Sequence, residues 1–192
     1  MARWEPGSRE RLRVAALELY VARGFEQTTT ADIARSVGLT ERTFFRYFTD
    51  KREVLFGGQE QLEKIFVDGI ASAPEGSSPV DAVAHALEAA AEFFPEDHRS
   101  DARQRQNVIL ANEGLREREL LKMARLSQSI ASALRDRGTP EPQSTLAAEA
   151  GVTVFGVAFR LWVEAGEKRS FAQLERDVLG ELQGVITPGR SS

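Results

Sequence analysis

Residues 28–51 read TTTADIARSVGLTERTFFRYFTDK, and this stretch predicts a helix-turn-helix. Ala34 lies four positions before Gly38, and Phe44 lies six positions after it. A small side chain at Ala34 lets two helices approach closely, and Gly38 tolerates the positive φ of a tight turn. Phe44 then fills the space between the helices. The second helix is expected to present these polar side chains to DNA: Thr40, Glu41, Arg42, Thr43, Arg46 and Tyr47.

Length and composition describe an ordinary globular chain. It has 192 residues, which suits one domain or two small ones, with 42% hydrophobic and 28% charged residues. Cysteine is absent, which excludes disulfides, zinc-thiolate sites and cysteine nucleophiles. No run of 18 uncharged apolar residues and no apolar signal segment occur, so we expect no membrane span and a cytoplasmic location.

Charge is distributed unevenly along the chain. Residues 1–56 hold 10 Arg/Lys against 8 Asp/Glu, a net charge of +2. The remaining 136 residues hold 15 against 21, a net charge of −6, so the whole chain carries −4. A mildly basic head on an acidic body is consistent with a small nucleic-acid-binding head attached to a body with another role.

Helical apolar spacing recurs along the chain, and no alternation of period two persists, so we expect an all-α fold of about nine helices. The expected helices are three short ones within residues 8–48, a long one from about 51 to 73, and others near 79–94, 100–113, 116–137, 143–165 and 170–186. Sequence spacing predicts these N-caps: Ser8, Thr29, Thr40, Asp50, Ser78 and Ser170.

Residues 9–55, RERLRVAALELYVARGFEQTTTADIARSVGLTERTFFRYFTDKREVL, resemble the N-terminal domain of the TetR family of bacterial transcriptional regulators. The likeness is looser in RERELLKMARL (116–126) and VFGVAFRLWVEAG (154–166), which are similar to members common in actinobacteria. The resemblance implies a DNA-binding domain at residues 1–50 and a ligand-binding and dimerisation domain at residues 51–192. Its partners would be double-stranded operator DNA, a second copy of the chain and a small effector.

The same resemblance implies that the start of the second helix and the whole third helix face DNA. Thr29 and Thr30 would then bind phosphate through their hydroxyls and the helix N-terminus. Glu41, Arg42 and Thr43 would reach base edges: the acid would accept from cytosine, the guanidinium would pair with guanine and the threonine would meet a thymine methyl.

Phosphate contacts are implied for Tyr47 and Lys51. Phe45 stands where the family usually has tyrosine, so a hydroxyl contact to phosphate is missing there, and Tyr47 or Arg46 would replace it. The structural alternatives are that Thr29 and Thr40 only cap helices and that Arg46 is only solvated. An arm at residues 2–7 either brings Arg3 to DNA or is disordered.

A monomer of this size makes too few contacts for operator-level affinity, so we expect a homodimer on a palindromic operator. Helices eight and nine would pair with their symmetry mates through these residues: Gly151, Phe155, Gly156, Leu174, Val178 and Leu182. The alternative is that the aromatic residues of helix eight fill only the intramolecular core.

The family resemblance also implies an effector pocket in the body. Its candidate residues are Phe66, Phe94, Asn107, Ile109, Leu110, Phe155, Phe159 and Trp162. So apolar a set suits a hydrophobic or amphipathic effector that releases the repressor by a population shift. Asn107 could equally be a surface residue.

Enzyme chemistry has little support in the sequence. The two histidines, His85 and His98, lie in no metal-binding motif, and no nucleophile elbow or phosphate loop occurs, so we expect neither catalytic residue nor cofactor nor metal. The remaining alternative is an all-α interaction protein or small-molecule-binding protein without specific DNA binding.

Overall fold

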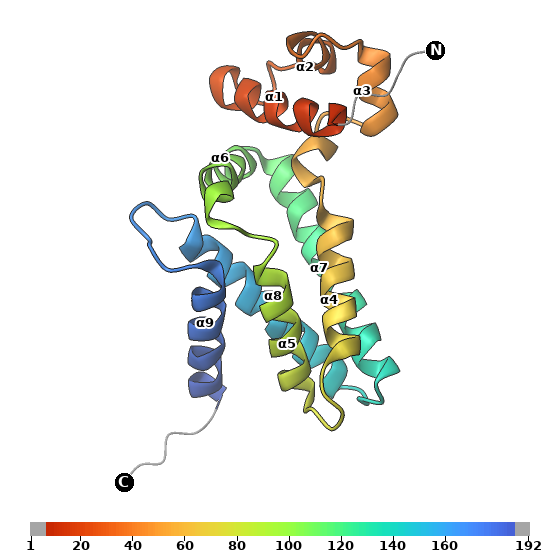
Figure 1. Cartoon of the computed structure of the whole chain (residues 1–192), viewed down its shortest axis with the longest axis vertical. Coiled ribbons are helices and arrows are strands. Elements are labelled where there is room, and N and C mark those ends of the chain that lie inside the picture. The colour runs from red at the N-terminus through yellow and green to blue at the C-terminus, as the bar shows by residue number, and fades with distance from the viewer. Residues whose placement is uncertain (1–6, 187–192) are drawn as a thin grey trace. The chain divides into compact units, whose positions relative to one another are not determined.

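A computed structural model describes residues 7–186, and all regular structure in this range is helical (Figure 1). The predicted all-α fold with nine α-helices is confirmed for the described residues. The elements are α1 (Ser8–Arg23), α2 (Thr30–Ser36), α3 (Glu41–Tyr47), the 3₁₀ turn η1 (Glu53–Phe56), α4 (Gln59–Ser72), α5 (Pro79–Ala91), the 3₁₀ turn η2 (Glu96–His98), α6 (Arg99–Leu110), α7 (Glu113–Asp136), α8 (Gln143–Trp162) and α9 (Phe171–Ile186). The prediction for Arg3 lies outside the described residues.

Several helices begin at their predicted caps. The Thr29 hydroxyl accepts a hydrogen bond from the Asp32 amide at 3.1 Å, and the Thr29 amide donates to the Asp32 carboxylate at 3.2 Å. The hydroxyl of Thr40 accepts from an amide in the first turn of α3, and that of Ser78 does the same for α5. These helix starts could be predicted from sequence spacing, because the side chain of each cap accepts hydrogen bonds from first-turn amides that have no partner within the helix.

Two predicted helix starts were wrong. α1 begins at Ser8 itself, with Gly7 as the N-cap. The long helix begins at Gln59 and not near residue 51, because Asp50 caps the short turn η1 by accepting from the amides of residues 52 and 53 at 2.8 and 2.9 Å. Gly58 follows with φ of 101°, a backbone conformation that ends η1 before α4 can start.

Within the described residues, the first compact unit contains residues 7–58 together with residues 101–119. Its core joins the helix-turn-helix to parts of α6 and α7, through buried residues such as Ile33, Phe44, Val108, Ile109 and Leu115. This unit is larger than the predicted domain of residues 1–50, since its core includes side chains distant in sequence. The functional division at residue 50 stays a prediction.

The second compact unit contains residues 59–100 and, up to the end of the described range, residues 120–186. Within it α4 packs on α5, and α8 packs on α5 and α9 (Figure 1). Gly69 allows the close contact between α4 and α5, since a Cβ there would lie 2.7 Å from the Ala86 Cα. Among the described helices α8 alone is long and apolar enough to cross a membrane, and it packs as a core helix of this unit.

Candidate DNA interface

α2, the turn and α3 have the geometry expected from the spacing of small and apolar residues. Ala34 of α2 and Phe44 of α3 are both buried and belong to the same hydrophobic core. Gly38 has φ of 71° in the turn, and the Leu39 amide donates to the Ala34 carbonyl at 2.8 Å. The turn therefore fixes the orientation of α3 relative to α2.

The first turn of α3 presents its polar side chains outward, and these side chains differ in whether they are already hydrogen-bonded within the protein. Arg42 is exposed. The Thr43 hydroxyl lies 2.9 Å from that of Thr40, which also accepts from the Thr43 amide at 3.2 Å. The Glu41 carboxylate accepts a hydrogen bond from the Thr30 hydroxyl and so joins α3 to the start of α2. Contact of Glu41 with a base requires this bond to be exchanged or shared.

The second turn of α3 carries an arginine–tyrosine pair beside an exposed aromatic ring. The Arg46 guanidinium donates to the Tyr47 hydroxyl at 3.3 Å and lies 5.2 Å from the centre of its ring. Phe45 is 53% exposed and packs edge-on against Phe44 at 5.6 Å. The pair places a hydroxyl and a cation together, which suits a phosphate group.

Lys51 has an architectural role that the sequence did not reveal. Its ammonium donates to the carbonyls of Phe25, Glu26 and Thr28 at 2.9, 3.3 and 3.2 Å and lies 4.4 Å from the Phe25 ring. These bonds use all three N–H donors of the ammonium. The buried hydroxyl of Tyr20 donates to the Lys51 carbonyl at 2.6 Å, and burial raises its pKa. A phosphate contact by the Lys51 side chain, which stays a prediction, requires one of these bonds to be given up.

Two arginines hold η1 from helices that are distant in sequence. The guanidinium groups of Arg105 and Arg118 lie 5.3 and 5.8 Å from the centre of the Phe56 ring. Arg105 pairs with Glu119 at 3.2 Å, and Arg118 pairs with Glu53. Burial lowers the pKa of Arg105. The sequence does not predict this arginine clamp, because no local pattern links residues this far apart.

Two protein-family models match this chain, and one of them covers the helix-turn-helix described above. Residues 12–56 match the family model described as bacterial regulatory proteins, tetR family, and residues 77–186 match that of the MftR C-terminal domain. The second match alone covers more than half of the chain. The chain belongs to the TetR family. Proteins of the TetR family are DNA-binding transcriptional regulators and not enzymes, as the resemblance implied.

Individual relatives of this TetR-family chain are partial or distant. The HTH-type transcriptional regulator TcmR of Streptomyces glaucescens is 37% identical over 82 residues, which cover 43% of this chain and 36% of TcmR. The chain thus spans about a third of that curated relative's length.

Solved TetR-family structures share the fold over nearly the whole chain. Thermus thermophilus FadR, a repressor solved with lauroyl-CoA, is 24% identical, covers 96% of this chain and 98% of its own, and has a TM-score of 0.54. SmeT, the repressor of the Stenotrophomonas maltophilia multidrug efflux pump SmeDEF, is 19% identical, with coverage of 97% and 96% and a TM-score of 0.56.

The residues predicted to bind an effector divide between the two units. Four of them, Phe94, Phe155, Phe159 and Trp162, form one aromatic cluster in the second unit, and the Phe66 ring lies 5.8 Å from that of Phe155. The other three belong to α6 in the first unit: Asn107 and Leu110 are exposed and Ile109 is fully buried in the core of that unit.

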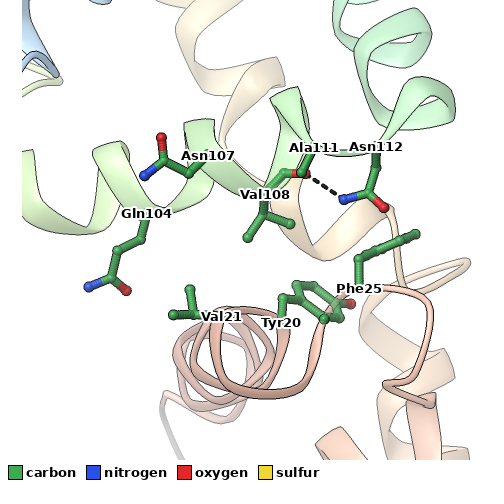
Figure 2. A pocket seen from close by; sticks show the side chains of 9 residues that line it. Tyr20, Val21, Phe25, Gln104, Asn107, Val108, Ala111 and Asn112 are labelled. Atoms are coloured by element: carbon green, nitrogen blue, oxygen red, sulfur yellow. Dashed lines mark hydrogen bonds between the residues drawn. The ribbon is translucent and has the colours of Figure 1, made fainter.

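Asn107 lines a different hollow from the one predicted. Figure 2 shows Asn107 and Gln104 of α6 above Val21 and Tyr20 of α1, around an open cleft of about 260 Å³ inside the first unit. The carboxamide of Asn112 is tied back to its own helix, because it donates to the Val108 carbonyl at 2.6 Å. The sequence placed Asn107 on the right helix but assigned that helix to the body.

The residues predicted to form the dimer also divide into buried and open sets. A Cβ on Gly151 would lie 2.5 Å from the Val83 Cγ1, so this glycine serves the contact between α8 and α5. Phe155 is buried in the aromatic cluster, and Leu174 is 0% exposed, so neither offers surface to a second protomer. Gly156, by contrast, has open space at its Cβ position, and Val178 and Leu182 are half-buried on α9.

Proposed function

We propose that this TetR-family protein is a cytoplasmic repressor that binds a palindromic operator as a homodimer and is released by a small hydrophobic or amphipathic effector. The observation that carries the proposal is the outer face of α3. That face combines an exposed guanidinium at Arg42, the Arg46–Tyr47 pair and the threonine-capped starts of two helices.

Each part of this face has a separate task on DNA. Arg42 reads a guanine edge by a bidentate hydrogen bond, which is worth about 1–3 kcal/mol of discrimination. Thr29 and Tyr47 bind phosphates and set the register of α3 in the major groove. Phosphate contacts carry little sequence information, so specificity rests on Arg42 and Thr43.

Dimerisation supplies the second recognition helix. The open faces of α8 and α9, at Gly156, Val178 and Leu182, pack against the same faces of a second protomer. A two-fold dimer places its recognition helices about 34–36 Å apart and therefore reads a palindrome.

The effector binds in the second unit and acts by a population shift. It favours a dimer whose recognition helices do not match consecutive major grooves. The aromatic cluster of that unit supports a hydrophobic effector, as do FadR, which was solved with lauroyl-CoA, and SmeT, which represses a multidrug efflux pump.

The proposal is tested by gel shift with the chain's own upstream DNA, with random DNA of equal length as competitor. Specific, salt-sensitive binding is expected, and Arg42→Ala should weaken it by roughly 5- to 150-fold per half-site, the equivalent of about 1–3 kcal/mol. Arg125→Ala, which removes an exposed arginine of α7, is the control and should leave binding unchanged.

Equal affinity of the wild-type chain for upstream and random DNA would contradict the proposal. It would favour the alternative of an α-helical interaction or small-molecule-binding protein without specific DNA binding.

A further inference from the structure

The aromatic cluster of the second unit is built around a ring that does not belong to a helix. Phe94 lies in the turn after α5, and its ring is 4.7 Å from that of Phe171, 5.6 Å from Phe155, 5.7 Å from Phe159 and 5.9 Å from Trp162. α8 and α9 supply the four surrounding rings, which form an aromatic cage, and Phe94 occupies this cage from a turn outside the helices. A ligand ring of similar size could take its place.

A buried acid lies beside this cage. Glu175 follows Phe171 by one turn of α9 on the same face, and it is 3% exposed. Neither of its carboxyl oxygens has a hydrogen-bond partner in the described part of the chain, and the same holds for the indole nitrogen of Trp162. Burial raises the pKa of Glu175 to about 9, with the nearby charge of Arg176 opposing this shift and that of Glu88 adding to it, so the group is mainly protonated at neutral pH. Buried polar groups without partners are rare in folded proteins and point to a missing ligand or water.

An open cleft of about 430 Å³ lies between α4 and α5 of the same unit. Its charged lining residues are both acidic, Asp68 and Glu92, and Asp68 is paired with Lys64. Phe93 also lines this cleft, and its ring packs edge-on against Phe94 at 5.4 Å. One ring that lines the cleft therefore contacts the occupant of the cage, and the acidic lining carries charge of the sign that attracts cations.

We propose that the cage is a binding site for a flat aromatic ligand that carries a protonated amine. The ligand enters by the acidic cleft, its ring replaces that of Phe94, and its ammonium group pairs with the carboxylate of Glu175. This inference rests on the proposed function, because it names the chemical class of the effector.

Two features select a cation over a neutral or anionic ligand. Ring faces attract cations, and the charge of Arg99, whose Cζ lies 5.2 Å from the centre of the Trp162 ring, is already paired with Glu96 at 2.6 Å. An ammonium group also stabilises the ionised carboxylate of Glu175 inside the unit, whereas an anionic ligand would be repelled by that carboxylate. The protonated carboxyl then loses one proton to solvent for each ammonium ligand bound.

The test uses the full-length protein and three probes that share one ring system: 2-naphthylmethylammonium, 2-naphthalenemethanol and 2-naphthoate. Titration calorimetry at neutral pH, with the fluorescence of the protein's tryptophans as a second readout, compares their affinities. The ammonium should bind at least about tenfold more tightly than the alcohol, which corresponds to one pKa unit of interaction. Its binding heat should vary with the ionisation enthalpy of the buffer, because about one proton is released per ligand.

Variants separate the carboxyl from the ring. Glu175→Gln should remove both the preference for the ammonium and the proton release, whereas Glu181→Gln, which alters an exposed acid of the same helix, should change neither. Phe94→Ala should bind the ammonium more tightly, because no ring has to be displaced. Circular dichroism shows whether each variant is folded, and proton release by the wild-type chain needs no variant.

Equal affinities for the three probes, or ammonium binding without proton release, would overturn the inference. Weaker binding by a folded Phe94→Ala variant would contradict the role of Phe94 as an occupant of the cage. Binding of the probes is measured without DNA, so their failure leaves operator recognition intact. Failure of the gel shift would instead count against the regulator and leave the measured affinities standing.

Discussion

Gly151 and Gly156 lie five residues apart on α8 and should respond in opposite ways to substitution by alanine. An alanine at Gly151 would place its Cβ 2.5 Å from the Val83 Cγ1, while the same position on Gly156 has no other atom within 4 Å. Val83 is buried and β-branched, so its side chain has few rotamers into which it can move.

The magnitude follows from two opposing contributions. Alanine in place of glycine in a helix stabilises the fold by about 0.8–1 kcal/mol. Overpacking at Gly151 costs about 1–3 kcal/mol, so Gly151→Ala should be neutral to destabilised by about 2 kcal/mol. At protein concentrations where the monomer predominates, Gly156→Ala gains the helix term alone, and the Tm of Gly151→Ala should be lower than that of Gly156→Ala by about 2–12 °C in a chain of this length.

Thermal melts at several protein concentrations separate folding from dimerisation, and sedimentation equilibrium measures the dimer directly. Gly156→Ala should weaken the proposed dimer, whereas Gly151→Ala should not. The double variant Gly151→Ala/Val83→Ala should be more stable than the sum of the two single changes predicts, by about 0.5–3 kcal/mol, because the two side chains compete for one space. Equal Tm values for both glycine variants, or no coupling with Val83, would refute the assignment of Gly151 to the contact between α8 and α5.

Three further predictions address the lysine, the buried acid and the arginine clamp. Lys51→Met should destabilise the fold by about 2–4 kcal/mol in urea unfolding, because charge-assisted hydrogen bonds to carbonyls are lost; unchanged stability with weaker DNA binding would assign Lys51 to phosphate instead. The pKa of Glu175 is raised from about 4.3 when unfolded to about 9 when folded, so the folded state binds the extra proton and stability should fall as pH rises between these values, by on the order of 1 kcal/mol per pH unit. Glu175→Gln should flatten this slope, and a slope equal to that of the wild type would show that other groups cause it. Arg105→Met should lower the Tm more than Arg116→Met, because Arg105 pairs with Glu119 and stacks on Phe56, whereas Arg116 is an exposed residue of α7.

Local chemistry made the helix-turn-helix predictable. Ala34, Gly38 and Phe44 each meet a steric demand within a few residues of one another, and the caps at Thr29 and Thr40 satisfy amides three residues on. Such demands are visible in sequence because helix and turn geometry fixes the spacing.

The contents of each unit were less predictable, because they depend on pairings across the chain. Ile109 looked like a body residue from its place in the sequence, yet it lies in the core that surrounds Phe44. Gly151 looked like a dimer contact, although its near neighbour is Val83 of the same chain. Apolar periodicity shows that a helix face is buried and does not show which partner buries it.

Glu175 is a different case, because its signal was present in the sequence. Phe171, Leu174 and Val178 define the apolar stripe of α9, and position 175 lies within that stripe, one turn after Phe171 and three residues before Val178. An acid at such a position must either be solvated, be paired or lose its charge, because an isolated carboxylate is too costly to bury. The structure leaves it buried and without a hydrogen-bond partner in the described residues, and its raised pKa is the expected response. An acid inside an apolar helical stripe is therefore a reason to look for a ligand, even where the surrounding residues read as an ordinary core.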